Sequence, residues 1–323
     1  MRILIVGAGS TGGYFGARLV QAGRDVTFLV RPARAAALRA NGLRVLSPLG
    51  DFAVAPRLAD AATLAETFDI VLVTVKAFGL AAAIEDFAPA VGPGTMILPV
   101  LNGMKHVDDL QARFGPARVL GGVCRVSTTL DAQGRIVHLA PLHELVYGEL
   151  DGQRTARVEA LHAFMSDAGF DARLSTRIAQ DLWDKWILLA TLGGICALAR
   201  GNVGEIAASE GGVDFVRAFL AEAAAVASAA GFAPRPQVVD YTLGVLTAAG
   251  SALTSSMYRD LMAGERVEAD QILGDLRARA LRAGVAVPLV SAAYVQLDVH
   301  QRRIQQARRP VPPPASAAAS RQA

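Results

Sequence analysis

Residues 3–16 read ILIVGAGSTGGYFG, and this stretch decides the fold of the chain. Its first four residues, Ile3 to Val6, form an apolar run that is too short for a helix and typical of a strand buried on both faces. Gly7, Gly9 and Gly12 follow at GxGxxG spacing. In this motif the first glycine permits a tight turn, the second lets a pyrophosphate approach the backbone, and the third lets a helix pack closely on the strand.

The context of the glycines favours a dinucleotide site over a merely structural turn. An amphipathic segment follows them, and a second buried strand is expected from Val26 to Val30. A helix that begins at the glycines points free N–H groups and the positive end of its dipole at phosphates. Ser10 and Thr11, which lie between Gly9 and Gly12, therefore join the three glycines as cofactor-binding candidates.

The residue after the second strand indicates which dinucleotide binds. NAD sites usually place Asp or Glu there to hold the ribose 2′-hydroxyl, whereas the 2′-phosphate of NADP needs a cation. In this chain the strand ends at Arg31, and Arg34 follows three residues later. A guanidinium is always charged and matches phosphate geometry, so we predict NADP(H) with Arg31 as the main contact. The alternative is a solvated arginine in a loop.

The composition of the chain restricts its class. With 323 residues, 52% of them hydrophobic, it suits two domains with separate cores. The net charge of +3 is small and the arginines are scattered, so no nucleic acid partner is expected. Cys124 and Cys196 lack metal-ligand spacing, which predicts no metal and a reducing, cytoplasmic location. No signal peptide is expected, and the apolar run from Trp186 to Ala199 is too short to span a membrane.

The expected elements change character near residue 177. Before that point, strands or hairpins are expected at 43–54, 68–75, 95–101, 119–123, 127–147 and 172–174, and helices at 32–40, 84–90, 107–114 and 155–168. After it, only helices are expected, at 178–198, 212–230, 237–248, 256–263, 268–283 and 288–305. The pattern predicts an α/β chain: an NADP-binding Rossmann-type doubly wound sheet over 1–176, an all-α C-terminal substrate and catalytic domain over 177–307, and a disordered Pro/Ala-rich tail over 308–323.

Two polar residues follow core strands of the first domain. Lys76 comes after the expected strand 68–75, and Asn102 comes after 95–101. The carboxyl ends of parallel strands form the ligand-binding edge of an open α/β sheet, so both are candidates for the cofactor and substrate site. The alternatives are a surface lysine and an Asn-Gly turn.

The helical domain offers three further candidates. Lys185 lies in an otherwise apolar helix beside Trp183 and Trp186, where partial burial would lower its pKa into the range of a useful acid; the alternative is a lysine that snorkels to solvent. Ser256 lies at a helix start that could hold a carboxylate or serve only as an N-cap. Glu268 begins another helix, where it could simply complement the dipole.

Taken together, these motifs resemble the ketopantoate reductases (2-dehydropantoate 2-reductases). The segments that carry the resemblance are the glycine motif with Arg31, Thr74-Val75-Lys76-Ala77, Asn102-Gly103-Met104, Trp183-Asp184-Lys185-Trp186, Ser255-Ser256-Met257 and Glu268-Ala269-Asp270-Gln271-Ile272-Leu273-Gly274. The resemblance implies NADPH-dependent reduction of a 2-oxo acid, ketopantoate, to pantoate in pantothenate biosynthesis. It implies that Lys185 is the general acid, that Glu268 binds the same hydroxyl and orients Lys185, and that Ser256 holds the substrate carboxylate. Asn102 and Lys76 would line the junction of cofactor and substrate.

The chain departs from this family at three positions. Leu189, Gly193 and Leu253 stand where members usually carry asparagine. Fewer amides mean fewer hydrogen bonds for a hydroxyl-bearing substrate, so a second hypothesis is a paralogue that acts on a less polar 2-oxo or 3-hydroxy acid. A third is a non-catalytic NADP(H) sensor. The alanine-rich helices leave a homodimer open.

Overall fold

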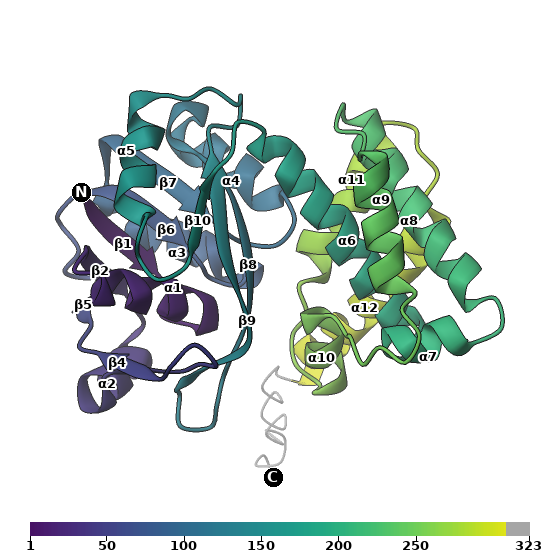
Figure 1. The fold of residues 1–323 in the computed structure, drawn as a ribbon, viewed down its shortest axis with the longest axis horizontal. Helices are drawn as coiled ribbons and strands as arrows, with labels where there is room; N and C mark the ends of the chain where they lie inside the picture. The colour runs from purple at the N-terminus through teal and green to yellow at the C-terminus, as the bar shows by residue number, and fades with distance from the viewer. Residues whose placement is uncertain (308–323) are drawn as a thin grey trace, which may run out of the picture.

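The computed structural model describes residues 1–307, so the expected tail at 308–323 lies outside the described residues. The chain forms an N-terminal domain with two sheets, β1 to β10, and a helical domain, α6 to α12, that stand side by side (Figure 1). The predicted class, an α/β domain followed by an all-α domain, is confirmed.

The first sheet is parallel throughout, with strand order β5-β2-β1-β6-β7. Its strands are β1 (Arg2–Val6), β2 (Asp25–Leu29), β5 (Arg57–Ala59), β6 (Phe68–Val73) and β7 (Val91–Pro99). From β1 the chain moves to β2 on one side and later returns to β6 on the other, so the strand order reverses between β1 and β6. Ligands of doubly wound sheets bind at the carboxyl ends of the strands at such a point.

The second sheet packs over the first, with helix α1 between them. Its strands are β3 (Leu43–Leu46), β4 (Phe52–Val54), β8 (Gly121–Leu130), β9 (Ile136–Gly148) and β10 (Asp171–Leu174). Helix α1 (Ser10–Gln21) buries Tyr14, Phe15 and Leu19 in the core that the two sheets share. The remaining helices of this domain are α2 (Pro32–Asn41), η1 (Ala77–Gly79), α3 (Leu80–Phe87), η2 (Ala88–Ala90), α4 (Lys105–Phe114), η3 (Pro116–Arg118) and α5 (Ala156–Met165).

One expected strand belongs to a different sheet. The segment 119–123 was expected to continue the parallel alternation, but only Val119 forms a bridge to Ile97 of the first sheet. From Gly121 the chain enters β8, which runs antiparallel to β9. A Cβ at Gly122 would lie 2.3 Å from the main-chain oxygen of Pro99, so this glycine permits the close crossing between the sheets.

The helical domain is built around α6 (Ile178–Ala199), which packs against α8, α10 and α12. The other elements are α7 (Val203–Ala208), α8 (Gly212–Ala229), α9 (Pro236–Leu246), α10 (Ser256–Met262), η4 (Asp270–Gly274), α11 (Asp275–Arg282) and α12 (Pro288–Ala307). Helix α7 was not expected from the sequence, and the expected helix 268–283 contains a π-helical turn, η4. By length and composition alone α6 could cross a membrane, but most of it is buried in this core.

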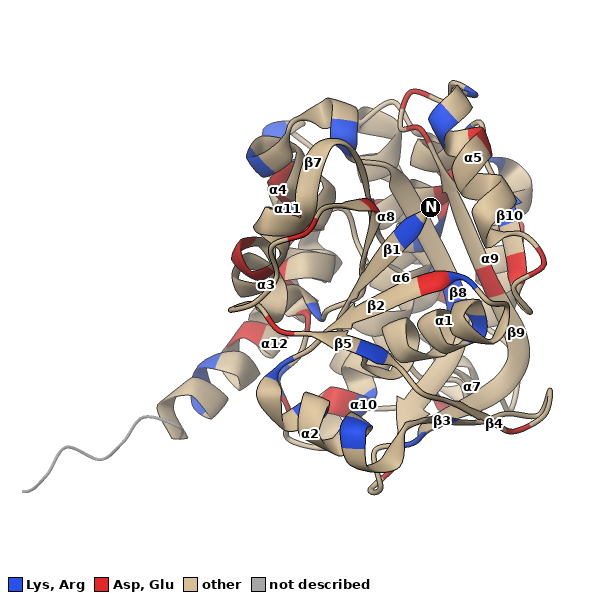
Figure 2. Ribbon diagram, turned by 90° about the vertical axis from the view of Figure 1, so that its left-hand side faces the viewer, with Lys and Arg blue, Asp and Glu red and all other residues tan. Residues whose placement is uncertain are grey.

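The charged residues are mixed in sign over both domains. In the view of Figure 2, blue Lys and Arg positions and red Asp and Glu positions are scattered among one another, and neither sign gathers on one side. Many form ion pairs, such as Arg2 with Glu66 and Arg57 with Asp25. This distribution agrees with the scattered arginines expected from the sequence.

The packing of α6 on α8 predicts opposite effects for two glycine-to-alanine changes. A Cβ at Gly194 would lie 2.0 Å from Cζ of Phe219, whereas a Cβ at Gly244 in α9 meets no atom within 4 Å. Gly194→Ala should destabilise the protein by about 1–3 kcal/mol through overpacking. Gly244→Ala should stabilise it by about 0.5–1 kcal/mol because a helix interior disfavours glycine. Thermal or urea unfolding measures both, and equal shifts for the two variants would contradict this packing.

Candidate active site

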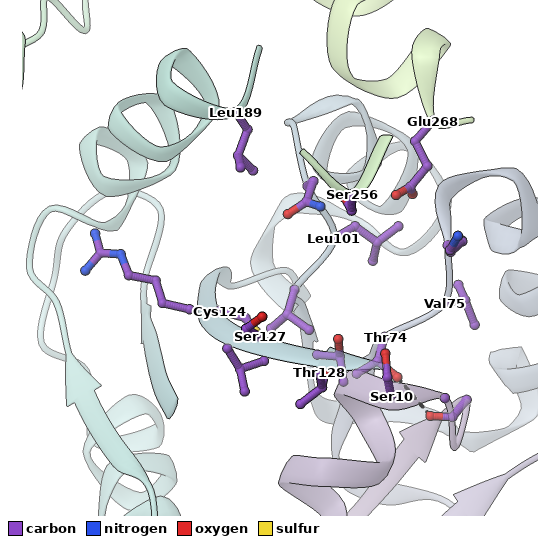
Figure 3. A pocket seen from close by; sticks show the side chains of 18 of the residues that line it. Ser10, Thr74, Val75, Leu101, Cys124, Ser127, Thr128, Leu189, Ser256 and Glu268 are labelled. Carbon is purple, nitrogen blue, oxygen red and sulfur yellow. Dashed lines mark hydrogen bonds between the residues drawn. The ribbon is translucent and has the colours of Figure 1, made fainter. Parts of the chain in front are cut away.

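A cleft of about 2620 Å³ lies between the two domains and reaches most of the predicted site residues. The N-terminal domain contributes the glycine loop and the segments that follow β2, β6 and β7, together with part of β8. The helical domain contributes α6, α9, the start of α10 and the residue Glu268. In Figure 3, Ser10 and Thr74 line one side of this pocket, Ser256 and Glu268 line another, and Leu189 projects from α6.

The glycine loop has the geometry that a dinucleotide needs. Gly7 has φ +98°, a conformation that side chains disfavour, and it makes the sharp turn after β1. A Cβ at Gly9 meets no atom within 4 Å, so the backbone there faces open cleft. A Cβ at Gly12 would lie 2.2 Å from the carbonyl oxygen of Gly7, which shows how tightly α1 packs on the turn. The residues present therefore fit a bound dinucleotide, with Ser10 and Thr11 at the N-terminus of α1.

The two arginines after β2 have different environments. Arg31 is exposed at the N-cap of α2 and lines the cleft, and its guanidinium makes no hydrogen bond or ion pair within residues 1–307. Arg34 instead donates from Nε to the carbonyl of Ala8 and from Nη1 to that of Gly134, both at 3.0 Å. Arg34 thus ties the glycine loop to the β8–β9 turn, while the Arg31 guanidinium remains available to a ligand.

Lys185 faces the cleft from α6 and reaches the opposite domain. Its Nζ donates a hydrogen bond of 2.8 Å to the main-chain oxygen of Cys124 in β8. Burial lowers the pKa of the ammonium below that of an ordinary lysine, and the nearby Arg125 lowers it further, while Glu268 acts in the opposite direction. The snorkelling alternative does not describe this lysine, because its amine is held inside the interdomain cleft.

Glu268 and Lys76 also connect the two domains. Oε1 of Glu268 accepts a hydrogen bond of 2.8 Å from the main-chain N–H of Ala77. Burial raises the pKa of this carboxyl group above its usual range. Next to it, Nζ of Lys76 pairs with Oδ2 of Asp260 at 2.8 Å, in a half-exposed ion pair between the end of β6 and α10. Lys76 therefore lines the cleft, with its charge directed toward the helical domain.

Asn102 and Ser256 each have a neighbour that fixes the backbone. The main-chain oxygen of Asn102 accepts a hydrogen bond of 2.9 Å from Nε2 of Gln271, and the Asn102 residue lines the cleft. At the start of α10 the N-cap is Ser255, whose Oγ accepts from the N–H of Tyr258 at 2.9 Å. The N-cap alternative thus applies to Ser255, and the neighbouring Ser256 lines the pocket (Figure 3).

Several groups at the site were not predicted from the sequence. They are the carbonyl of Cys124, the N–H of Ala77, and the side chains of Asp260 and Gln271. Two of them are main-chain groups, whose contacts cannot be predicted from a pattern of residue types. The thiol of Cys124 is buried and its pKa is raised by that burial, so its carbonyl is the part that serves the site. Among residues 1–307, no cluster of three or more His, Cys, Asp or Glu residues could hold a metal ion.

Comparison with known proteins gives matches over both domains. The family model described as ketopantoate reductase PanE/ApbA matches residues 3–152, and the model of that family's C-terminal domain matches residues 177–301. The uncharacterized oxidoreductase YkpB of Bacillus subtilis is 35% identical over 301 residues, which cover 93% of this chain and 99% of YkpB. The 2-dehydropantoate 2-reductase of Mesorhizobium japonicum is 31% identical, with 84% of this chain and 89% of the relative covered.

A solved structure agrees over nearly the whole chain. The crystal structure of 2-dehydropantoate 2-reductase from Geobacter metallireducens has a TM-score of 0.84 and 32% sequence identity, and it covers 93% of this chain and 99% of its own. These matches make the chain an oxidoreductase of the type that acts on a CH–OH group. The chain belongs to the ketopantoate reductase PanE/ApbA family.

Proposed function

We propose that this chain catalyses NADPH-dependent reduction of a 2-oxo acid to the 2-hydroxy acid. The observation that carries the proposal is the position of Lys185, whose ammonium lies in the same interdomain cleft as the glycine loop and is held on the carbonyl of Cys124. Residues 1–176 serve as the NADP-binding domain in this proposal, and residues 177–307 supply the acid and the substrate contacts.

Bound NADPH supplies the hydride for the ketone carbon. Lys185 delivers a proton from Nζ to the oxygen as it becomes an alkoxide, and its lowered pKa makes that transfer easier than from an ordinary lysine. Glu268, which belongs to the helical domain like Lys185, accepts from the hydroxyl and orients Lys185. Ser256 holds the substrate carboxylate, and Asn102 and Lys76 line the region between cofactor and substrate.

Ketopantoate is the first substrate to test, because the chain is similar to enzymes named 2-dehydropantoate 2-reductase. In that case the product is pantoate, and the chain acts in pantothenate biosynthesis. The two buried free cysteines fit a cytoplasmic enzyme. We propose no partner beyond the small-molecule substrate and a second copy of the chain, for which the exposed Val295 and Val299 of α12 offer apolar surface.

A second candidate substrate is favoured by the wall of the cleft next to Lys185. One face of α6 presents leucines at helical spacing, and Leu253 adds an apolar side chain that is 38% exposed. The leucines of α6 that line the cleft are Leu188, Leu189 and Leu192. At Gly193 a Cβ would lie 2.5 Å from Cε of Met257, so the position has no room for a polar side chain unless Met257 moves. A 2-oxo acid with an apolar substituent would match this wall better than one that carries a hydroxyl.

The arginine after β2 predicts cofactor preference. Arg31→Ala should weaken NADPH binding about 10- to 100-fold, because a hydrogen bond to a charged group contributes about 1.5–3 kcal/mol. NADH affinity should change little, since NADH lacks the 2′-phosphate. Isothermal titration of both cofactors measures this. Arg44→Ala is the control, because Arg44 is an exposed arginine of β3 in the same domain and is not among the residues that line the cleft. A native protein that clearly prefers NADH would refute the assignment.

The lowered pKa of Lys185 predicts the pH dependence of the reaction. The value of kcat/KM for ketone reduction should fall as pH rises through that pKa, below the range where an ordinary lysine loses its proton. Oxidation of the hydroxy acid should rise over the same range, because the free amine then accepts the proton.

Lys185→Ala should reduce kcat about 10²- to 10⁴-fold. Normal turnover in this variant would exclude the proposed acid, and Lys105→Ala, on an exposed part of α4, is the control.

A substrate panel separates the two candidate substrates. If the leucine wall selects the substrate, 2-oxo-4-methylpentanoate should exceed ketopantoate in kcat/KM, because a buried hydroxyl without a partner costs about 1–3 kcal/mol. Leu189→Asn should then raise the relative kcat/KM for ketopantoate, whereas Leu281→Asn, at a side chain that is 78% exposed, should not. Strong and selective reduction of ketopantoate by the native chain would remove the second candidate.

A further inference from the structure

One buried side chain joins the loop that carries Asn102 to the segment that carries Glu268. Nε2 of Gln271 donates to the main-chain oxygen of Asn102 at 2.9 Å and lies 2.8 Å from Nδ1 of His106. Gln271 is 4% exposed and His106 is fully buried. Burial lowers the pKa of His106 to about 3, so its ring is neutral at pH 7 and Nδ1 can accept from the amide. Both hydrogens of the Gln271 amide are therefore used, one of them on Asn102.

The backbones of the two segments also touch. Gly103, directly after Asn102, has φ +79°, and a Cβ at this position would lie 2.5 Å from the main-chain oxygen of Gln271. A side chain at this position would therefore push the turn away from the helical domain. The direction in which Asn102 enters the cleft thus depends on two contacts with Gln271, one with its side-chain amide and one with its main-chain oxygen.

The backbone of Gln271 is itself held in an unusual conformation. It belongs to the π-helical turn η4, in which the N–H of Asp275 bonds to the carbonyl of Asp270. Trp186, the residue after Lys185 on α6, donates from Nε1 to the carbonyl of Ile272 at 2.9 Å. The turn η4 is therefore connected to three parts of the site. It accepts a hydrogen bond from Trp186, which follows Lys185 in the chain. It begins two residues after Glu268, and its Gln271 holds the loop of Asn102. Such π turns occur often at functional sites.

We propose that Gln271 is the positioning residue of Asn102, and that η4 keeps the Asn102 amide in register with Lys185 and Glu268. This inference rests on the proposed function, since it assigns the register to the hydride-transfer site. Gln271 does not touch the reacting groups, because its amide is buried on Asn102 and His106. It acts through the direction of the Asn102 side chain.

The main test is Gln271→Met, which keeps the length of the side chain and removes its N–H donors. We expect kcat for the best 2-oxo acid to fall about 10- to 100-fold, because small misplacements of groups at a reacting centre have effects of this size. The Kd of NADPH should change less than about threefold, as the glycine loop and Arg31 are untouched. In a protein with ¹⁵N-labelled asparagine, the side-chain amide signal of Asn102, assigned with Asn102→Asp, should broaden or shift.

The matched control is Asp108→Asn. It removes the 2.5 Å ion pair between Asp108 of α4 and Arg279 of α11, which joins the same two regions without contacting Asn102. Its kcat and its Asn102 signal should stay close to native even where Tm falls. Gly103→Ala carries the test if Gln271→Met does not fold, because it leaves the Gln271 amide in place and displaces the turn; we expect the same loss of kcat and the same change in the signal.

The inference is overturned if Gln271→Met keeps kcat within about twofold of native, if Asp108→Asn lowers kcat equally, or if the Asn102 signal is unchanged. If the native chain binds NADPH but reduces no 2-oxo acid, the proposed function fails. The Asn102 signal then still decides whether Gln271 positions this residue.

Discussion

The site depends on a cation held by a neutral acceptor. A carboxylate partner would raise the pKa of Lys185 and retain its proton, whereas the carbonyl of Cys124 satisfies one N–H without adding a full negative charge. Burial can then lower the pKa, and the amine becomes a better proton donor. The carbonyl belongs to one domain and the lysine to the other, so this state of the lysine exists only while the domains are together.

Other polar contacts hold the domains in that relation. The N–H of Ala77 meets Glu268, Lys76 meets Asp260, and Gln271 meets Asn102. A hydrogen bond of this kind contributes about 0.5–1.5 kcal/mol, and a half-exposed ion pair contributes at most about 1 kcal/mol. Contacts of this strength favour one arrangement of the two domains without preventing their relative motion, which interfaces between domains commonly permit. The binding groups and the proposed acid therefore meet through several modest interactions.

The sequence predicts the parts of this architecture that follow from local patterns. The buried run before the glycines, the hairpin within residues 127–147 and the long apolar helix from Ile178 all occur as expected. The prediction for 119–123 placed the strand in the wrong sheet, because an apolar run does not show which neighbouring strand it pairs with. The π turn η4 was missed because its sequence also fits a regular helix. Main-chain partners such as the carbonyl of Cys124 cannot be predicted from residue types. The sequence therefore predicts which side chains belong to the site but not which groups they contact.

The carbonyl that binds Lys185 belongs to strand β8. Among residues 1–307 this strand pairs along its length with β9 alone, so its other edge presents main-chain groups that no strand covers. Carbonyls along such an edge alternate with N–H groups, and the lysine takes the one at Cys124. A single-residue deletion before this point would turn the neighbouring side chains to the opposite face of the sheet, but it would still leave a main-chain carbonyl in front of the ammonium, because every residue carries one. The acceptor of this lysine therefore does not depend on which side chain stands at position 124, and only a displacement of the strand itself would remove it.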